Sequence, residues 1–131
     1  MQYLLLVYTD ADIAARVPAQ QFDSDMRQCL AHSDELAAQG RLLDYRQLEA
    51  PQTAKSVRVR AGRTSVVDGP FAETKEMLAG FNLVEAESLD EAVRMAQELP
   101  WTAYGCVEVR QVKDIGAVRR QVGAPAGDYP D

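Results

Sequence analysis

The sequence predicts an α+β domain, in which an antiparallel sheet carries two helices on one face. Two helical patterns alternate with extended segments along the 131 residues, and a two-residue link joins two of those segments as a hairpin. The predicted order is therefore strand–helix–strand, hairpin, strand–helix–strand. That order is the split βαβ, ferredoxin-like arrangement with an inserted β-hairpin.

The first predicted strand covers residues 2–8, a near-continuous apolar run of the kind buried on both faces. Residues 9–17 are polar and rich in alanine, and Pro18 suits the first turn of a helix. That helix extends to Gly40, a C-terminal stop signal. Its apolar face recurs at spacings of three and four residues. The face comprises Phe22, Met26, Cys29, Ser33 and Leu36.

A second strand is predicted over residues 41–48, and the sequence APQT breaks it. Residues 56–60 and 63–67 then form a hairpin, because Ala61-Gly62 is a two-residue link with glycine in second place. Valine alternates with serine and arginine in its first strand, which is typical of a sheet with one wet face.

A further strand is predicted over residues 79–86, and Ser88 with Glu91 forms a capping box that begins the second helix. Pro100 ends this helix. Its predicted inward residues are Leu89, Ala92, Val93, Ala96 and Leu99. The last strand covers residues 104–112. The domain is assigned to residues 1–113, and residues 114–131, rich in Gly, Pro and charge, are expected to be a flexible tail.

The net charge of −6 argues against general binding to nucleic acid or to anionic membranes. No run is long enough to span a membrane, and the apolar start lacks the basic region of a signal peptide, so a cytoplasmic protein is expected. Cys29 and Cys106 are expected to be reduced and buried. With one histidine they offer no zinc-ligand spacing, and neither a metal nor a cofactor is expected.

The richest stretch is VVDGPFAETKEM at residues 66–77. Asp68 is a candidate general base or cation anchor at the end of a strand, and Gly69 would let a ligand approach the backbone. Pro70 and Phe71 would shape the edge of the pocket. The alternative is that Asp68 accepts hydrogen bonds within an ordinary turn.

His32 is the candidate proton partner, since histidine is the residue type whose unperturbed pKa lies near neutrality, although the favoured alternative is that it simply lies at the helix boundary. Glu73 and Lys75 are candidates to position a polar substrate, or else form a solvated face. Tyr8 is among the rings expected to line a cavity beside the sheet, or else belongs to the core or a dimer interface. Asp68 and His32 within hydrogen-bond reach of each other would favour an enzyme.

The stretch VVDGPFAETKEMLAGFNLVEAESLDEAVRMA resembles the signature region of the DGPF proteins, within the wider YCII-like family. The opening MQYLLLVY, the hairpin SVRVRAGRTSVVDGPF and the closing VEVRQV are similar too, so the resemblance covers about residues 1–112.

The resemblance implies a dimeric α/β barrel of ferredoxin-like subunits, with a pocket in each subunit. The wider family is thought to place a His-Asp pair there, and a lyase reaction on a chlorinated aromatic is known among relatives. The position of that histidine falls at Cys29 in this chain, and His32 lies one turn later. Many DGPF members are encoded beside, or fused to, extracytoplasmic-function sigma factors.

The face of the sheet opposite the helices would leave apolar groups wet in a monomer, which is unfavourable at roughly 25 cal/mol per Å². A homodimer paired sheet to sheet is therefore expected. Two functions stay open. One is a cofactor-free enzyme using acid–base chemistry on a small polar or aromatic molecule beside the DGPF turn. The other is a non-catalytic small-ligand-binding or regulatory module, linked to a sigma factor.

Overall fold

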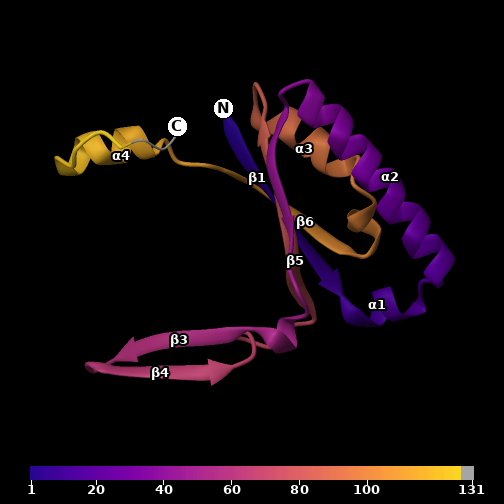
Figure 1. Cartoon of the computed structure of the whole chain (residues 1–131), viewed down its shortest axis with the longest axis horizontal. Helices are drawn as coiled ribbons and strands as arrows, with labels where there is room; N and C mark the ends of the chain where they lie inside the picture. Colours follow the sequence, from indigo (N-terminus) through magenta and orange to yellow (C-terminus); the bar gives the residue numbers. More distant parts are fainter. Residues whose placement is uncertain (128–131) are drawn as a thin grey trace.

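The structure is a computed structural model that describes residues 1–127. One antiparallel sheet carries two helices on a single face (Figure 1), so the α+β, ferredoxin-like prediction is confirmed. The strand order is β2-β5-β1-β6. These strands are β1 (Gln2–Asp10), β2 (Leu42–Gln47), β5 (Glu76–Glu85) and β6 (Gly105–Gln111).

The helices on this face are α2 (Ala19–Ala38) and α3 (Leu89–Gln97). The short α1 (Ala11–Arg16) links β1 to α2, and the 3-10 turns η1 (Pro51–Thr53) and η2 (Pro100–Ala103) lie in connections. No helix within residues 1–127 is long and apolar enough to cross a membrane.

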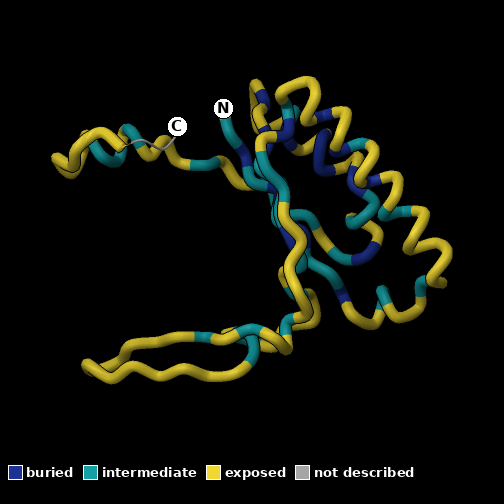
Figure 2. Tube along the Cα trace, viewed as in Figure 1, coloured by how far each residue is buried: buried dark blue, intermediate teal, exposed yellow. Residues whose placement is uncertain are grey.

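The core lies between the helices and the sheet (Figure 2). In β1 the alternating residues Tyr3, Leu5 and Val7 are buried beneath the helices, whereas Leu4 and Leu6 are only half-buried on the other face. The expectation that β1 is buried on both faces is therefore wrong for this chain, because helices cover one side alone.

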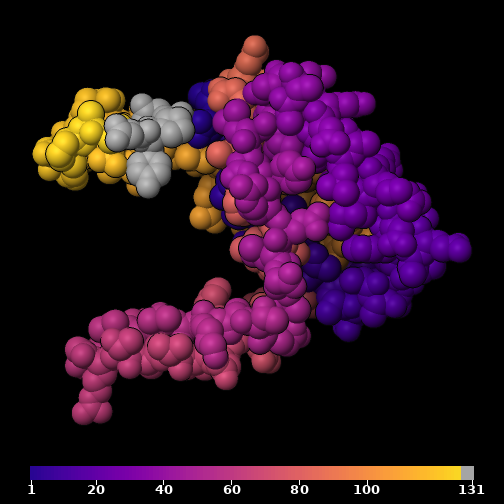
Figure 3. All heavy atoms as spheres, in the orientation of Figure 1, coloured from indigo at the N-terminus to yellow at the C-terminus, as the bar shows by residue number. Residues whose placement is uncertain are grey.

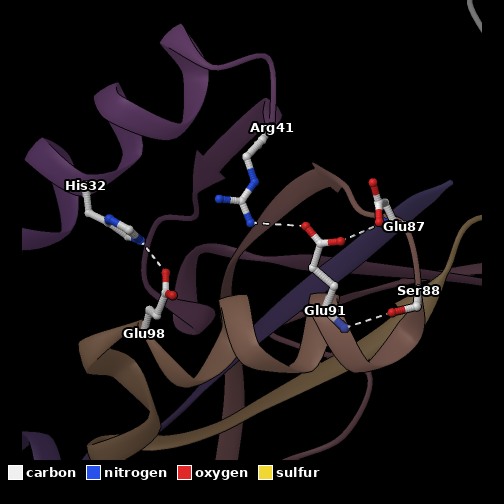
Figure 4. Close-up of polar contacts among 6 residues, drawn as sticks. All are labelled: His32, Arg41, Glu87, Ser88, Glu91 and Glu98. Carbon is white, nitrogen blue, oxygen red and sulfur yellow. Dashed lines mark hydrogen bonds and ion pairs between the residues drawn. The ribbon is translucent and has the colours of Figure 1, made fainter.

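Helix α3 begins with the predicted cap. The backbone N–H of Glu91 donates to Ser88 Oγ over 3.1 Å, and the Glu91 carboxylate accepts from the N–H of Glu87 over 3.0 Å (Figure 4). The predicted inward face was partly wrong, since Leu89 and Val93 are exposed. The buried residues of α3 recur at spacings of three and four, and Val93, directly after Ala92, does not belong to this stripe. That stripe is Ala92, Met95, Ala96 and Leu99.

Strands β3 (Lys55–Arg60) and β4 (Arg63–Asp68) form a separate two-stranded sheet that projects from the domain (Figure 1). At the link Ala61 has φ 52° and Gly62 has φ 75°. Positive φ at both central residues is the type I′ geometry that matches the twist of a hairpin.

The segment expected to be a tail contains a helix, α4 (Ile115–Val122). Asp114 caps it by accepting from the N–H of Ala117 over 3.2 Å, and Gly123 ends it with φ 73°. Asp114 and Gly123 were the local signals for this helix. The flexibility of the segment and the boundary near residue 113 stay predictions, and residues 128–131 lie outside the described chain.

Candidate functional site

The tetrapeptide at residues 68–71, here the DGPF turn, follows β4 directly. Gly69 has φ 93°, a conformation that favours glycine. Its N–H donates to the carbonyl of Ala54 over 2.7 Å, and its carbonyl accepts from Ser56 Oγ over 2.9 Å. The turn is thus fastened to the beginning of β3.

A cavity of about 970 Å³, here the DGPF cavity, lies between this turn and the sheet face that faces away from the helices. It is open to solvent on one side, and Figure 3 shows the hollow between the hairpin and the sheet. Three predicted residues, Tyr8, Pro70 and Phe71, line it. Glu76, Cys106 and Glu108 line it as well.

The strand register explains which side chains reach the DGPF cavity. Tyr8 pairs with Cys106 across β1 and β6, on the face opposite the helices. Glu108 lies two residues further along β6 on that face, and its carboxylate accepts from Arg110 Nε over 3.0 Å. Cys106 is exposed, so the expectation of two buried cysteines is wrong for Cys106 and confirmed for Cys29. Apolar and polar residues alternate in the sequence VEVRQ that follows Cys106. Continued back by one residue, this alternation assigns Cys106 to the solvent-exposed face, together with Glu108.

A neighbouring groove of about 540 Å³ contains Glu73 and Lys75. The ammonium of Lys75 lies 3.7 Å from Oδ2 of Asp10, whose side chain is only 5% exposed. Asp10 also caps α1 by accepting from the N–H of Asp12 over 2.9 Å. Lys75 therefore joins the segment after the DGPF turn to the end of β1.

Asp68 does not line the DGPF cavity, although its neighbours Pro70 and Phe71 do. Its carboxylate is solvent-exposed and forms an ion pair with Lys55, directly across the hairpin. A role for Asp68 as base or anchor stays a prediction.

His32 lies on α2, on the helix-covered side of the sheet, and its Nε2 is 2.8 Å from the carboxylate of Glu98 (Figure 4). The DGPF turn lies beyond the other face. The structure therefore does not bring His32 and Asp68 together within one chain, because their elements sit on opposite sides of the sheet.

A second, smaller pocket of about 200 Å³ lies between α2 and the sheet; it is here the aromatic pocket. Three rings form one wall. The centroid of Trp101 is 5.9 Å from that of Phe22 and 5.2 Å from that of Tyr104, in tilted and edge-to-face geometries. An engineered apolar cavity of about 150 Å³ holds benzene, so this volume suits a single substituted ring.

Polar groups accompany the rings. The Tyr104 hydroxyl donates to Oδ2 of Asp25 over 2.8 Å, and Gln21 Nε2 donates to Oδ1 of Asp25 over 2.9 Å. Burial, together with the hydrogen bond and the negative charge of Asp25, raises the pKa of Tyr104 above its ordinary value. The phenol is therefore protonated at neutral pH and oriented by a fixed carboxylate.

Asn82 places a carboxamide in the aromatic pocket. It pairs with Leu5 in the sheet, so its side chain lies on the helix-covered face, where apolar groups dominate. No residue within 1–127 forms a hydrogen bond to this carboxamide. Asn82 is half-buried, so its carboxamide offers a donor and an acceptor to a ligand beside the rings.

The sequence contained one signal for this pocket that the predictions did not use. Asn82 interrupts an otherwise apolar strand, AGFNLVEA. Cys29, at the position that the resemblance assigns to the family's histidine, lines the same pocket and is 7% exposed. Within residues 1–127 no group of three or more His, Cys, Asp or Glu side chains is arranged to hold a metal ion.

The YCII-related domain profile matches residues 1–116. An uncharacterised protein of Rhizobium meliloti (strain 1021) is 37% identical over 99 residues, which cover 76% of this chain and 80% of that protein. The chain therefore belongs to the YCII-related family.

The chain is also similar in structure to 5-chloro-2-hydroxyhydroquinone dehydrochlorinase (TftG) from Burkholderia phenoliruptrix AC1100, solved in complex with 2,5-dihydroxybenzoquinone. The match has a TM-score of 0.49 and 19% identity, and covers 86% of this chain and 94% of that one.

Proposed function

We propose that this YCII-related protein is a cofactor-free enzyme that binds a small aromatic molecule with polar substituents and moves a proton on it. The observation that carries the proposal is the aromatic pocket, which is lined by three rings in tilted and edge-to-face contact, by the half-buried carboxamide of Asn82, and by the Tyr104 phenol that a carboxylate holds. Apolar walls with a few convergent polar groups and a perturbed pKa are the usual features of a small-molecule site.

The proposed chemistry uses the pair Tyr104 and Asp25 as a relay. A hydroxyl proton of the bound molecule passes to the Tyr104 oxygen, while the Tyr104 proton passes to the carboxylate of Asp25. The molecule becomes a phenolate, the phenol is restored, and Asp25 holds one proton. Asn82 would donate to the phenolate oxygen as its charge develops. Proton transfer of this kind typically contributes about 10²–10⁴-fold to a rate.

Binding can be measured with the protein's own fluorophore, because Trp101 is the single tryptophan and lines the aromatic pocket. Catechol, resorcinol and 4-hydroxybenzoate serve as probes. We expect them to quench Trp101 fluorescence in the wild type. Asn82→Leu should weaken the affinity about tenfold, as loss of one hydrogen bond of about 1.4 kcal/mol would. Quenching unchanged in Asn82→Leu would place the ligand elsewhere.

Proton transfer is tested separately from binding by deuterium exchange at the ring carbons of resorcinol in D₂O, followed by NMR. The wild type should accelerate the exchange. Tyr104→Phe keeps the ring, and its acceleration of the exchange should be at least tenfold smaller than that of the wild type. Tyr45→Phe is the matched control, since Tyr45 also lines the pocket. Binding without any accelerated exchange would contradict the enzyme and favour a binding module.

A second function, binding of a small ligand in the DGPF cavity without turnover, is favoured by one observation. Two acids at and around that cavity are paired, Glu108 with Arg110 and Asp68 with Lys55, so these two suit ligand recognition better than proton abstraction. Regulation of an extracytoplasmic-function sigma factor belongs to this second proposal. A thermal shift with the same probes that is lost in Phe71→Ala but kept in Asn82→Leu would favour it.

A further inference from the structure

One polar side chain on the inner side of α2 is not explained by the fold. The buried residues of this helix are Cys29, Ser33 and Leu36, and Ser33 is the one that carries a hydroxyl. A serine inside a helix normally turns its hydroxyl to solvent or donates it to the carbonyl four residues earlier. Ser33 is only 3% exposed, and within residues 1–127 its hydroxyl forms no hydrogen bond. It therefore has neither of the usual partners.

The hydroxyl of Ser33 is in contact with the open space of the aromatic pocket. Among the described residues, every side-chain nitrogen or oxygen that is sealed from solvent has a hydrogen-bond partner. Because the Ser33 oxygen has no partner, it is not sealed, and a small part of its surface is accessible. Ser33 lines the aromatic pocket, so this accessible part faces the pocket. The hydroxyl thus offers a donor and an acceptor to a bound molecule.

A serine at this position is unfavourable for the fold itself. On burial the hydroxyl gives up hydrogen bonds to water, and here no group of the protein replaces them. Alanine occupies nearly the same space, has a higher helix propensity and brings no polar group. The stability of the domain therefore does not account for the hydroxyl of Ser33, whereas a ligand that forms a hydrogen bond with it does.

Ser33 and the pair Tyr104 and Asp25 lie at different points along α2. Asp25, Cys29 and Ser33 recur at every fourth residue, so they follow one another along one side of the helix. Asp25 accepts from the Tyr104 hydroxyl, and Ser33 lies two turns beyond Asp25, about 12 Å along the helix axis. Two hydrogen bonds of about 2.8 Å take up nearly half of this distance. The remainder accommodates one aromatic ring with polar groups on opposite carbons.

The aromatic pocket offers no free charge to the group that meets Ser33. In the part of the chain that the structure describes, the one charged residue that lines this pocket is Arg46. Its side chain is 65% exposed, forms an ion pair with Asp44 and donates to the carbonyl of Tyr45. A carboxylate beside Ser33 would be buried without a counter-ion, which is unfavourable. The pocket therefore favours a neutral group at this place.

We propose that Ser33 determines which ring the aromatic pocket accepts, and that the substrate is a phenol with a neutral hydrogen-bonding group, such as a carboxamide or a ketone, on the carbon opposite its hydroxyl. This inference rests on the proposed function and specifies its substrate class. The phenol hydroxyl meets Tyr104 and Asn82, and the opposite group forms a hydrogen bond with Ser33. Ser33 takes no part in the proton transfer, but it holds the ring in place against Tyr104.

The test compares two ligands that differ in one substituent, phenol and 4-hydroxybenzamide, by quenching of Trp101 fluorescence. The wild type should bind 4-hydroxybenzamide about tenfold more tightly than phenol, the gain expected from one hydrogen bond in a desolvated site. In Ser33→Ala the affinity for phenol should stay the same and the preference for the amide should disappear. The wild type should bind 4-hydroxybenzoate, which is charged at neutral pH, no more tightly than phenol.

Two further variants separate the hydroxyl from other effects of the substitution. Ser33→Cys keeps nearly the same shape but forms only weak hydrogen bonds, so in a reducing buffer it should lose the preference as Ser33→Ala does. A preference that returned in Ser33→Cys would mean that the volume of the side chain matters and would overturn the proposal. Ser24→Ala is the matched control, because it removes an exposed hydroxyl from the same helix, and it should keep the wild-type preference.

Urea unfolding without ligand completes the test. Ser33→Ala should be at least as stable as the wild type, because the substitution removes a buried hydroxyl that has no partner. A clearly less stable Ser33→Ala would show that the fold uses the hydroxyl and would overturn the proposal. An equal preference for 4-hydroxybenzamide in the wild type and Ser33→Ala would also overturn it, but would leave the proposed function standing. If neither ring quenches Trp101 in the wild type, this inference and the proposed function both fail.

Discussion

The imidazole Nε2 of His32 lies 2.8 Å from the carboxylate of Glu98, and this contact joins α2 to the C-terminal cap of α3. A second carboxylate, that of Glu35, lies 4.0 Å from Nδ1 of the same ring. The one histidine of the chain is thus held between two acids on the outer side of the helices. Its partner is Glu98, far from the DGPF turn.

Replacement of His32 by Gln should therefore have a small effect. Exposed ion pairs contribute at most about 1 kcal/mol, and both partners here are partly exposed. We expect urea unfolding to show a loss within that limit, and resorcinol exchange to keep the wild-type rate. Glu98→Gln removes the other partner of the ion pair and should lower the stability by the same amount as His32→Gln. If His32→Gln lost the accelerated exchange while Glu98→Gln kept it, the histidine would be a catalytic residue.

The phenol of Tyr104 should make stability fall at high pH. Its pKa is raised in the folded state by burial and by Asp25, so folding favours the protonated phenol. This stabilisation is complete below the unfolded value of about 10 and is lost as the pH rises through the folded pKa. Urea unfolding from pH 8 upward should show a steeper loss for wild type than for Tyr104→Phe. Tyr45→Phe serves as the control, and parallel curves for all three proteins would contradict the assignment.

Most of the fold was predictable because its signals are local. The spacing of Cys29, Ser33 and Leu36 alone identifies the buried side of α2. The link Ala61-Gly62 alone fixes the register of the hairpin. The helix α4 after residue 113 was not predicted. The prediction of a flexible tail followed the Gly, Pro and charge content of the segment and did not use the helix caps at Asp114 and Gly123.

The candidate site was less predictable, because it depends on which side of the sheet each element lies. Asp68 and His32 have suitable chemistry, yet they lie on opposite sides. Tyr104 and Asp25 are 79 residues apart, and nothing local links them. Only Asn82, a polar residue inside an apolar strand, pointed to the aromatic pocket from the sequence.

Asp10 should stabilise the domain chiefly as a helix cap. Its Oδ1 accepts from the N–H groups of Asp12 and Ile13, over 2.9 and 3.3 Å. Asp10→Ala should cost about 1 kcal/mol, within the range of roughly 0.5–2 for lost caps. Asp10→Asn keeps a capping oxygen and should cost less. Equal losses for the two variants, measured by urea unfolding, would mean that the charge opposite Lys75 matters more than the cap.

The close approach of β6 to β1 should make Gly105 intolerant of a side chain. A Cβ at this position would overlap the carbonyl oxygen of Tyr8, a backbone atom that the sheet holds in place. Gly105→Ala should therefore cost about 2–3 kcal/mol, the upper part of the range for overpacking. Gly40→Ala is the control, because Gly40 has open space around it. The alanine there would be destabilised only by the φ of 73°, by about 1 kcal/mol.

The same substitution should reach the aromatic pocket. Gly105 directly follows Tyr104, whose carbonyl accepts from the N–H of Asp10 over 2.9 Å, so a displaced β6 moves the phenol away from Asp25. We expect Gly105→Ala to weaken quenching of Trp101 by catechol, and Gly40→Ala to leave it unchanged. A Gly105→Ala protein that unfolds early yet binds catechol normally would show that the pocket tolerates the shift. It would then be Phe22 and Trp101, more than the Tyr104–Asp25 pair, that hold the ring.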